Sequence, residues 1–184
     1  MTKNTPNYSQ IISPENYNRI ISFEHLYISA SDRVIKDLIE KFKPSEGIAE
    51  VVELGCGPAR ILPLITNVSN IHLTGIDHDA EFIKFAEEYL AKKYPEVTVE
   101  EADFLTWKNK GPVDIFYSQG VHHHIHKGTD TTTYLSNMVT QLNKNGVYIL
   151  SDEFLPEYTN ETSRKIKAVI WYCHIFSSAN RLGY

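Results

Sequence analysis

A short run rich in β-branched residues ends abruptly in two closely spaced glycines, and this feature limits the folds open to the chain most. The run is 49-AEVVEL-54, followed by Gly55, Cys56 and Gly57 and then by Pro58. This order predicts a buried strand, a tight turn and a helix that begins at the proline. Glycine lets the backbone approach a ligand closely, and a helix N-terminus favours negative groups. The segment therefore predicts a ligand-binding turn, with a purely structural turn as the alternative.

The same alternation of strand-like and helix-like segments continues along the chain. Further strand-like runs cover 70–76, 97–102, 113–118 and 147–151, and helical patterns cover 14–43, 59–66, 79–90 and 130–143. Strands that alternate with helices predict a parallel sheet covered on both faces. We therefore expect the α/β fold class, as a three-layer Rossmann-like sandwich with a mainly parallel sheet.

Acidic residues follow the second and third predicted strands, at the edge where such sheets bind ligands. Asp77 lies 22 residues after Gly55, where a carboxylate can accept hydrogen bonds from the hydroxyls of a ribose. Both a nicotinamide dinucleotide and an adenosyl cofactor satisfy this requirement. Asp79 is better explained as the cap of the next helix. Asp103, with Phe104 beside it, suits an adenine amino group and ring, although a surface carboxylate is an equal alternative.

Five segments in the same order resemble the class I S-adenosylmethionine-dependent methyltransferases over about residues 30–155. These segments are ELGCGPAR, TGIDHD, EADF, DIFYSQGVHHHI and LNKNGVYILSDEF. The resemblance implies S-adenosylmethionine as cofactor, S-adenosylhomocysteine as product and a small-molecule acceptor. It divides the single domain expected over residues 1–184 into a helical cap (1–45), a cofactor-binding core (46–155) and a C-terminal helix (156–184).

The resemblance also implies a role for each residue at this edge of the sheet. Gly55, Cys56 and Gly57 would approach the methionine end of the cofactor, and Glu53 would support their loop. Asp77 would hold the ribose, with His78 beside the ribose or the adenine. The residues implied to frame the adenine or to face the cofactor from the fourth strand are Asp103, Phe104, Ser118 and Gln119.

A dinucleotide-dependent dehydrogenase is the competing interpretation of the glycine turn. Its fingerprint requires glycine or alanine at the position of Arg60, for close packing of helix on strand. A dehydrogenase also has no stated need for Glu53 or for an acid at Asp103. Methyl transfer is therefore favoured over hydride transfer.

Four histidines, His122, His123, His124 and His126, follow the fourth predicted strand. Their proximity leaves three interpretations open: loop packing, a general base or a metal site. We predict no metal site, because no cluster of acidic or cysteine ligands lies nearby in the sequence. His123 and His124 are the candidate catalytic bases. Asp152 and Glu153, after the fifth strand, are a second candidate base or amine-anchoring pair, and a solvated strand end is the alternative for them.

Composition limits the partners and the compartment. A net charge of −5 without a block of lysine or arginine argues against nucleic acid as a partner. No apolar run approaches the roughly 20 residues that span a bilayer, and the N-terminus has no signal-peptide core. Two cysteines cannot form a disulfide framework. We expect a cytoplasmic protein with no membrane partner.

Only 33 residues follow Ser151, and they read as helical over 157–176. The resembling family has two further strands after that helix, so we expect the last two family strands to be missing. A catalytically silent cofactor-binding fragment or subunit is therefore the alternative to an active enzyme. The apolar residues 168–176 and the uncovered edge of the fifth strand predict association into a homo-oligomer.

Overall fold

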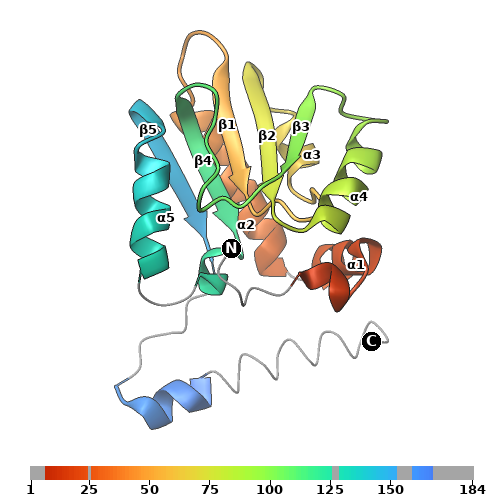
Figure 1. Cartoon of the computed structure of the whole chain (residues 1–184), viewed down its shortest axis with the longest axis vertical. Coiled ribbons are helices and arrows are strands. Elements are labelled where there is room, and N and C mark those ends of the chain that lie inside the picture. The colour runs from red at the N-terminus through yellow and green to blue at the C-terminus, as the bar shows by residue number, and fades with distance from the viewer. Residues whose placement is uncertain (1–6, 25, 126–128, 153–158, 168–184) are drawn as a thin grey trace.

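The computed structural model describes residues 7–24, 26–125, 129–152 and 159–167 (Figure 1). Five strands form one sheet in the order β3-β2-β1-β4-β5, and every neighbouring pair is parallel. The strands are β1 (Ala49–Leu54), β2 (Ile71–Asp77), β3 (Val97–Glu101), β4 (Val113–Gln119) and β5 (Leu142–Ser151). The predicted α/β class and Rossmann-like sandwich are confirmed. Because all strands run the same way, their carboxyl ends meet at one edge of the sheet.

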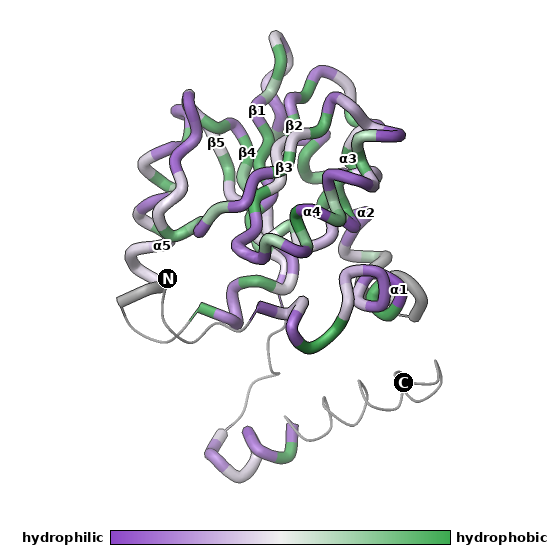
Figure 2. The backbone as a smooth tube through the Cα atoms, turned by 45° about the vertical axis from the view of Figure 1, so that its right-hand side comes forward, coloured by the Kyte–Doolittle hydropathy of each residue, from purple (hydrophilic) through white to green (hydrophobic). Residues whose placement is uncertain are grey.

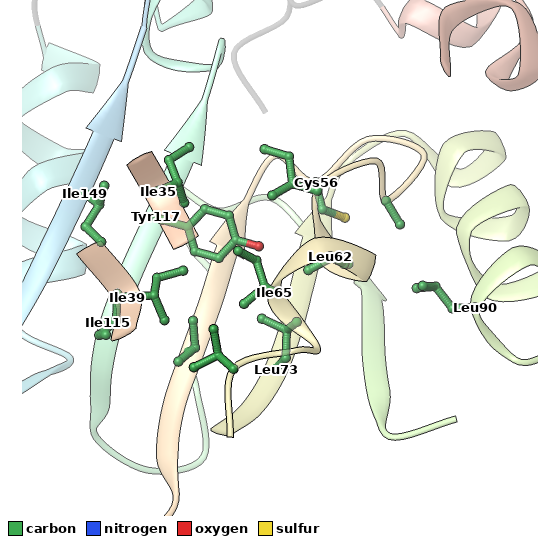
Figure 3. Packing of buried hydrophobic residues seen from close by; sticks show 14 of the residues in the cluster. Ile35, Ile39, Cys56, Leu62, Ile65, Leu73, Leu90, Ile115, Tyr117 and Ile149 are labelled. Atoms are coloured by element: carbon green, nitrogen blue, oxygen red, sulfur yellow. The ribbon is translucent and has the colours of Figure 1, made fainter. Parts of the chain in front are cut away.

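Helices cover both faces of the sheet, as the alternating pattern predicts. One face carries α2 (Leu26–Phe42), α3 (Leu62–Ile65) and α4 (Ala80–Leu90), whose apolar side chains share a buried cluster with Val51, Leu73 and Tyr117 (Figure 3). The other face carries α5 (Thr129–Val139), which buries Tyr134 and Met138 against Phe116. Figure 2 shows hydrophobic stretches along the central strands and mostly hydrophilic loops at the margins. Burial of these two clusters is the main driving force for the fold.

Short elements lie at the carboxyl edge of the sheet. A 3₁₀ turn, η1 (Tyr8–Gln10), and helix α1 (Pro14–Glu24) precede α2, and a second 3₁₀ turn, η2 (His122–His124), follows β4. In Figure 1 the strand arrowheads point toward η2 and α1. Within the predicted cap, η1 and α1 therefore lie at the ligand-binding edge, whereas α2 packs on one face of the sheet.

Several predicted boundaries differ from the structure. The helix expected from Pro58 begins at Leu62, and β5 begins at Leu142, because residues 143–146 form an irregularity within the strand instead of a separate turn. In α2, Ile35 and Ile39 are buried, whereas the apolar residues Val34 and Phe42 are 55% and 43% exposed. The buried stripe of this helix passes through Asp32, which is 5% exposed.

Residues 161–167 are helical, in agreement with part of the predicted C-terminal helix. The apolar segment 168–176 lies outside the described residues, as do His126 and Glu153. Across the part of the chain that the structure describes, no helix is long and apolar enough to cross a membrane.

Candidate cofactor site at the carboxyl edge of the sheet

The loop after β1 is held in a conformation that few residue types adopt. The φ angles of Gly55, Gly57 and Ala59 are +69°, +52° and +61°. The N–H groups of Gly55 and Cys56 both donate to the carbonyl oxygen of Ile76, at 2.8 and 3.0 Å. The predicted helix N-terminus at Pro58 is wrong, because the left-handed conformation of Ala59 interrupts the helical path until α3. An anion at this loop would therefore meet a glycine-rich turn and not the end of a long helix.

Asp77, the predicted ribose acid, joins the loop to the end of β2. Its two carboxylate oxygens accept hydrogen bonds from the N–H groups of Gly57 (2.8 Å) and Asp79 (2.9 Å). Burial raises the pKa of Asp77, against the lowering effect of these two hydrogen bonds. Each carboxylate oxygen has a further lone pair, so the group can still accept hydrogen bonds from vicinal hydroxyls.

Asp79 caps α4, as the sequence predicts, by accepting the N–H of Glu81 at 3.2 Å. Its other carboxylate oxygen accepts the N–H of Ser9 in η1 at 2.9 Å. Aromatic rings extend this link: Tyr8 lies 5.3 Å from His124 and 6.2 Å from Tyr17 between ring centroids. The N-terminal segment is thus tied to α4 on one side and to η2 on the other.

Glu53 lies in the core beside the glycine loop. The family resemblance implies that Glu53 supports this loop. It is 3% exposed, and the hydroxyl of Tyr117 donates to its Oε2 at 3.0 Å. Burial raises the pKa of Glu53 from 4.5 to about 8, because the charged form loses its hydration. Burial also raises the pKa of the neighbouring Cys56 thiol. Glu53 and Cys56 are therefore both protonated at neutral pH and form a neutral floor under the glycine loop.

Replacing Glu53 by glutamine is expected to flatten the pH dependence of folding stability. Between pH 4.5 and about 8 the native wild type keeps a proton on Glu53 that the unfolded chain has released. The unfolding free energy of the wild type therefore falls as pH rises through this window, by up to about 1.4 kcal/mol per pH unit. Urea unfolding of wild type and Glu53→Gln at pH 5, 6, 7 and 8 measures the difference. A Glu87→Gln variant on the exposed face of α4 serves as control, and parallel profiles for Glu53→Gln and wild type would contradict the assignment.

Arg60 forms a network that was not predicted from the sequence. Its guanidinium binds both carboxylate oxygens of Asp32 in α2, at 2.6 and 2.9 Å, and also donates to the amide oxygen of Gln119. The Gln119 amide nitrogen donates to Asp32 (3.1 Å) and to Ser31 (2.9 Å), and Ser31 pairs with Ser151 at 2.6 Å. One turn of α2 thus holds the ends of β4 and β5 and the glycine loop together, and the charge of Arg60 is compensated within the protein.

The third predicted acid, Asp103, organises the turn after β3. Its Oδ1 accepts the N–H of Leu105 at 3.0 Å, and the adjacent ring of Phe104 contacts Tyr134 edge to face at 5.5 Å. The ring of His122 lies 5.9 Å from the same tyrosine. Phe104 and His122 therefore both pack on Tyr134. Ser118, also predicted at the cofactor, is buried, and its hydroxyl bonds to that of Tyr148 at 2.7 Å.

Three of the four clustered histidines, His122, His123 and His124, form η2, and Asp152 at the end of β5 anchors this turn. Asp152 accepts the N–H groups of His122 (2.5 Å) and His123 (3.2 Å), and its other oxygen lies 2.6 Å from Nδ1 of His123. His124 contacts the hydroxyl of Tyr8 through Nε2 at 3.1 Å. Burial lowers the pKa of His124 to about 4, so this ring is neutral at physiological pH. The two candidate bases thus have different environments.

Two buried ring nitrogens support a ligand at this edge. Among the described residues, Nε2 of His78 and Nδ1 of His122 have no hydrogen-bond partner, and such atoms are costly to bury unless water or a ligand satisfies them. Nδ1 of His78 lies 3.4 Å from the Asp77 carboxylate at the end of β2, and His122 lies in the segment after β4. These side chains fit a cofactor with polar ring atoms and hydroxyls. No group of three or more histidine, cysteine, aspartate or glutamate side chains in the described ranges is arranged to hold a metal ion.

Comparison with known proteins agrees with this geometry. A family model for a methyltransferase domain matches residues 45–181. The trans-aconitate 2-methyltransferase of Azoarcus sp. strain BH72 is 27% identical over 135 residues, which cover 73% of this chain and 49% of that protein. The enzyme of the same name from Agrobacterium fabrum strain C58 is 30% identical over 116 residues, 62% of this chain and 42% of its own length. The chain thus spans about half the length of the curated relatives it matches.

A solved structure supports the same fold at lower sequence identity. The N-methyltransferase NodS from Bradyrhizobium japonicum WM9, in complex with S-adenosyl-L-homocysteine, superimposes with a TM-score of 0.61. The two chains are 17% identical, and the match covers 79% of this chain and 72% of the other. At this identity the likeness concerns the fold alone.

Proposed function

Because the chain belongs to the class I S-adenosylmethionine-dependent methyltransferase family, we propose that it transfers a methyl group from S-adenosylmethionine to a small-molecule acceptor. The observation that carries the proposal is the convergence of the glycine loop, Asp77 and Asp103 at the carboxyl ends of three adjacent strands. Bound S-adenosylmethionine supplies a methyl group activated by a sulfonium, so the protein contributes chiefly orientation and exclusion of water.

In this proposal each part of the edge binds one part of the cofactor. Gly55, Cys56 and Gly57 line the methionine end, above the neutral floor that contains Glu53. The side chain of Asp77 accepts the ribose hydroxyls, and the orphaned Nε2 of His78 hydrogen-bonds to the cofactor beside them. The residues proposed to surround the adenine or to face the cofactor from β4 are Asp103, Phe104, Ser118 and Gln119.

A catalytically silent cofactor-binding fragment is the second candidate function. It is favoured by the coverage of the relatives, since this chain spans 49% and 42% of their lengths, and a longer protein can supply further walls of an acceptor pocket. Both candidates bind the cofactor, but only the first produces S-adenosylhomocysteine. We further propose a cytoplasmic location and self-association through the outer edge of β5, the terminal strand of the described sheet.

Isothermal titration calorimetry with S-adenosylhomocysteine, S-adenosylmethionine and NAD tests the cofactor. We expect micromolar binding of the two adenosyl compounds and none of NAD; the reverse result would overturn the proposal. Native mass spectrometry of the same sample reports the oligomeric state. Formation of S-adenosylhomocysteine with a panel of carboxylates, amines and phenols then separates an active enzyme from a silent fragment.

A further inference from the structure

Asp152 is held in place from three directions beside the histidine cluster. Its side chain is 1% exposed, and two backbone N–H groups and the ring of His123 point at its oxygens. A carboxylate that accepts several such hydrogen bonds is stabilised in its ionised form. The position of the His123 ring is therefore fixed by a buried anion at the end of the neighbouring strand.

This contact also selects the tautomer of His123. When Nδ1 carries the hydrogen that is donated to Asp152, the lone pair of the neutral ring lies on Nε2. The side chain of His123 is 38% exposed, so a small molecule at this edge can reach the ring. An imidazole oriented in this way by a carboxylate accepts a proton, and the carboxylate stabilises the imidazolium that results.

Other titratable groups surround His123. On η2 itself, His122 precedes it and the ring of His124 lies 3.8 Å away between centroids. From η1 the hydroxyl of Tyr8 contacts His124, and His78, after β2, lies close enough to act electrostatically on His124. Asp152 is the carboxylate that contacts the His123 ring. His124 hydrogen-bonds with Tyr8 and is the more buried ring, which favours His123 as the ring that accepts a proton.

The charges at this edge disfavour an anionic acceptor. Four carboxylates are present, on Asp77, Asp79, Asp103 and Asp152. The guanidinium of Arg60 is already paired with Asp32. A carboxylate acceptor would approach several groups of its own charge, and this repulsion is unfavourable in a partly buried site.

Building on the proposed function, we infer that His123 and Asp152 form a proton-accepting pair and that the acceptor carries a hydrogen on its nucleophilic atom, as an amine or hydroxyl does, in contrast to a carboxylate. In the transfer step the acceptor's nitrogen or oxygen forms a bond to the methyl carbon. The bond between that carbon and sulfur breaks, and its electron pair stays on sulfur. The hydrogen leaves the acceptor as a proton and passes to Nε2 of His123. Asp152 is a positioning residue in this scheme.

The first test follows the His123 ring by NMR in the complex with S-adenosylhomocysteine, in wild type and Asp152→Asn. We expect the wild-type ring to carry its hydrogen on Nδ1 when neutral. In the variant we expect the midpoint of its titration to move to lower pH, because the imidazolium loses its counter-ion. An unchanged midpoint and tautomer would overturn the pair. The His72→Gln variant, which breaks an exposed histidine–glutamate contact at the opposite end of the sheet, should leave the His123 signals unchanged.

The second test measures turnover against pH with primary amines, phenols and trans-aconitate. We expect amines or phenols to be methylated, and kcat to fall by about 10²-fold in His123→Gln and by a smaller factor in Asp152→Asn. Cofactor affinity should stay within about twofold in both variants. If trans-aconitate is methylated and the two variants match wild type, the inference fails while the methyltransferase proposal stands. If S-adenosylhomocysteine does not bind the wild type at all, the proposed function itself fails.

Discussion

Gly55→Ala is expected to destabilise the protein severely and to abolish cofactor binding. A β-carbon at this position would lie 2.5 Å from Cγ2 of Val121, and the backbone has a φ of +69°. The left-handed conformation costs a non-glycine residue about 1–2 kcal/mol, and overpacking costs about 1–3 kcal/mol more. Together these are a large part of the roughly 5–15 kcal/mol by which a domain is stable. Urea unfolding and titration with S-adenosylhomocysteine measure both effects.

The structure provides controls that separate the two causes. Gly120 has a φ of +67°, but a β-carbon there would meet no atom within 4 Å, so Gly120→Ala should show only the backbone cost. A second control removes the clash by shortening Val121. The double variant Gly55→Ala/Val121→Ala should recover part of the stability that Gly55→Ala loses, and a double-mutant cycle should show this recovery as a coupling energy between the two positions. Equal destabilisation by Gly55→Ala and Gly120→Ala would show that the contact with Val121 is unimportant. Since Val121 leads directly into η2, the contact also links the glycine loop to the histidine cluster.

The sequence was sufficient to predict the architecture because hydrophobic patterning determines the faces of strands and helices. The carboxyl ends of adjacent parallel strands must meet, so the proximity of the glycine loop, Asp77 and Asp103 followed from the order of the segments. Because β4 and β5 are neighbours in the sheet, their carboxyl ends also bring Asp152 to the histidines. The sequence did not predict which histidine ring Asp152 orients, because this depends on the exact backbone path of η2. The structure places Nδ1 of His123 2.6 Å from Oδ1 of Asp152.

The interaction between Arg60 and Asp32 has a signal in the sequence that is easily overlooked. Asp32, Ile35 and Ile39 follow one another at helical spacing, so an acidic residue lies on the buried stripe of α2. A buried carboxylate requires a partner, and Arg60 occupies the position where a dinucleotide fingerprint has glycine or alanine. The delayed start of α3 was less predictable, because nothing in the residue type of Ala59 indicates a φ of +61°.

Asp77→Asn is expected to reduce affinity for S-adenosylhomocysteine by about 10²-fold or more, which corresponds to roughly 2.7 kcal/mol. The carboxylate accepts one N–H on each oxygen, from Gly57 at 2.8 Å and from Asp79 at 2.9 Å. An asparagine has one acceptor oxygen, so its NH₂ group must face one of these donors. The variant therefore loses a buried hydrogen bond that positions the glycine loop as well as the proposed acceptor for the ribose hydroxyls. Unfolding of the ligand-free protein should show a further loss of about 1–3 kcal/mol.

Two acidic residues at the same edge allow these contributions to be separated. Asp79→Asn keeps an acceptor for the N–H of Glu81 while weakening the contact with Ser9, so it should loosen the attachment of η1 to α4 with little effect on affinity. Asp103→Asn removes a charge from the proposed adenine side and should lower affinity by a smaller factor than Asp77→Asn. Calorimetry with S-adenosylhomocysteine, and with adenosine as a ligand that retains the ribose, compares the three variants. If Asp77→Asn bound both ligands as tightly as wild type, Asp77 would be a structural link between β2 and the loop, and the ribose would have to be held by another group.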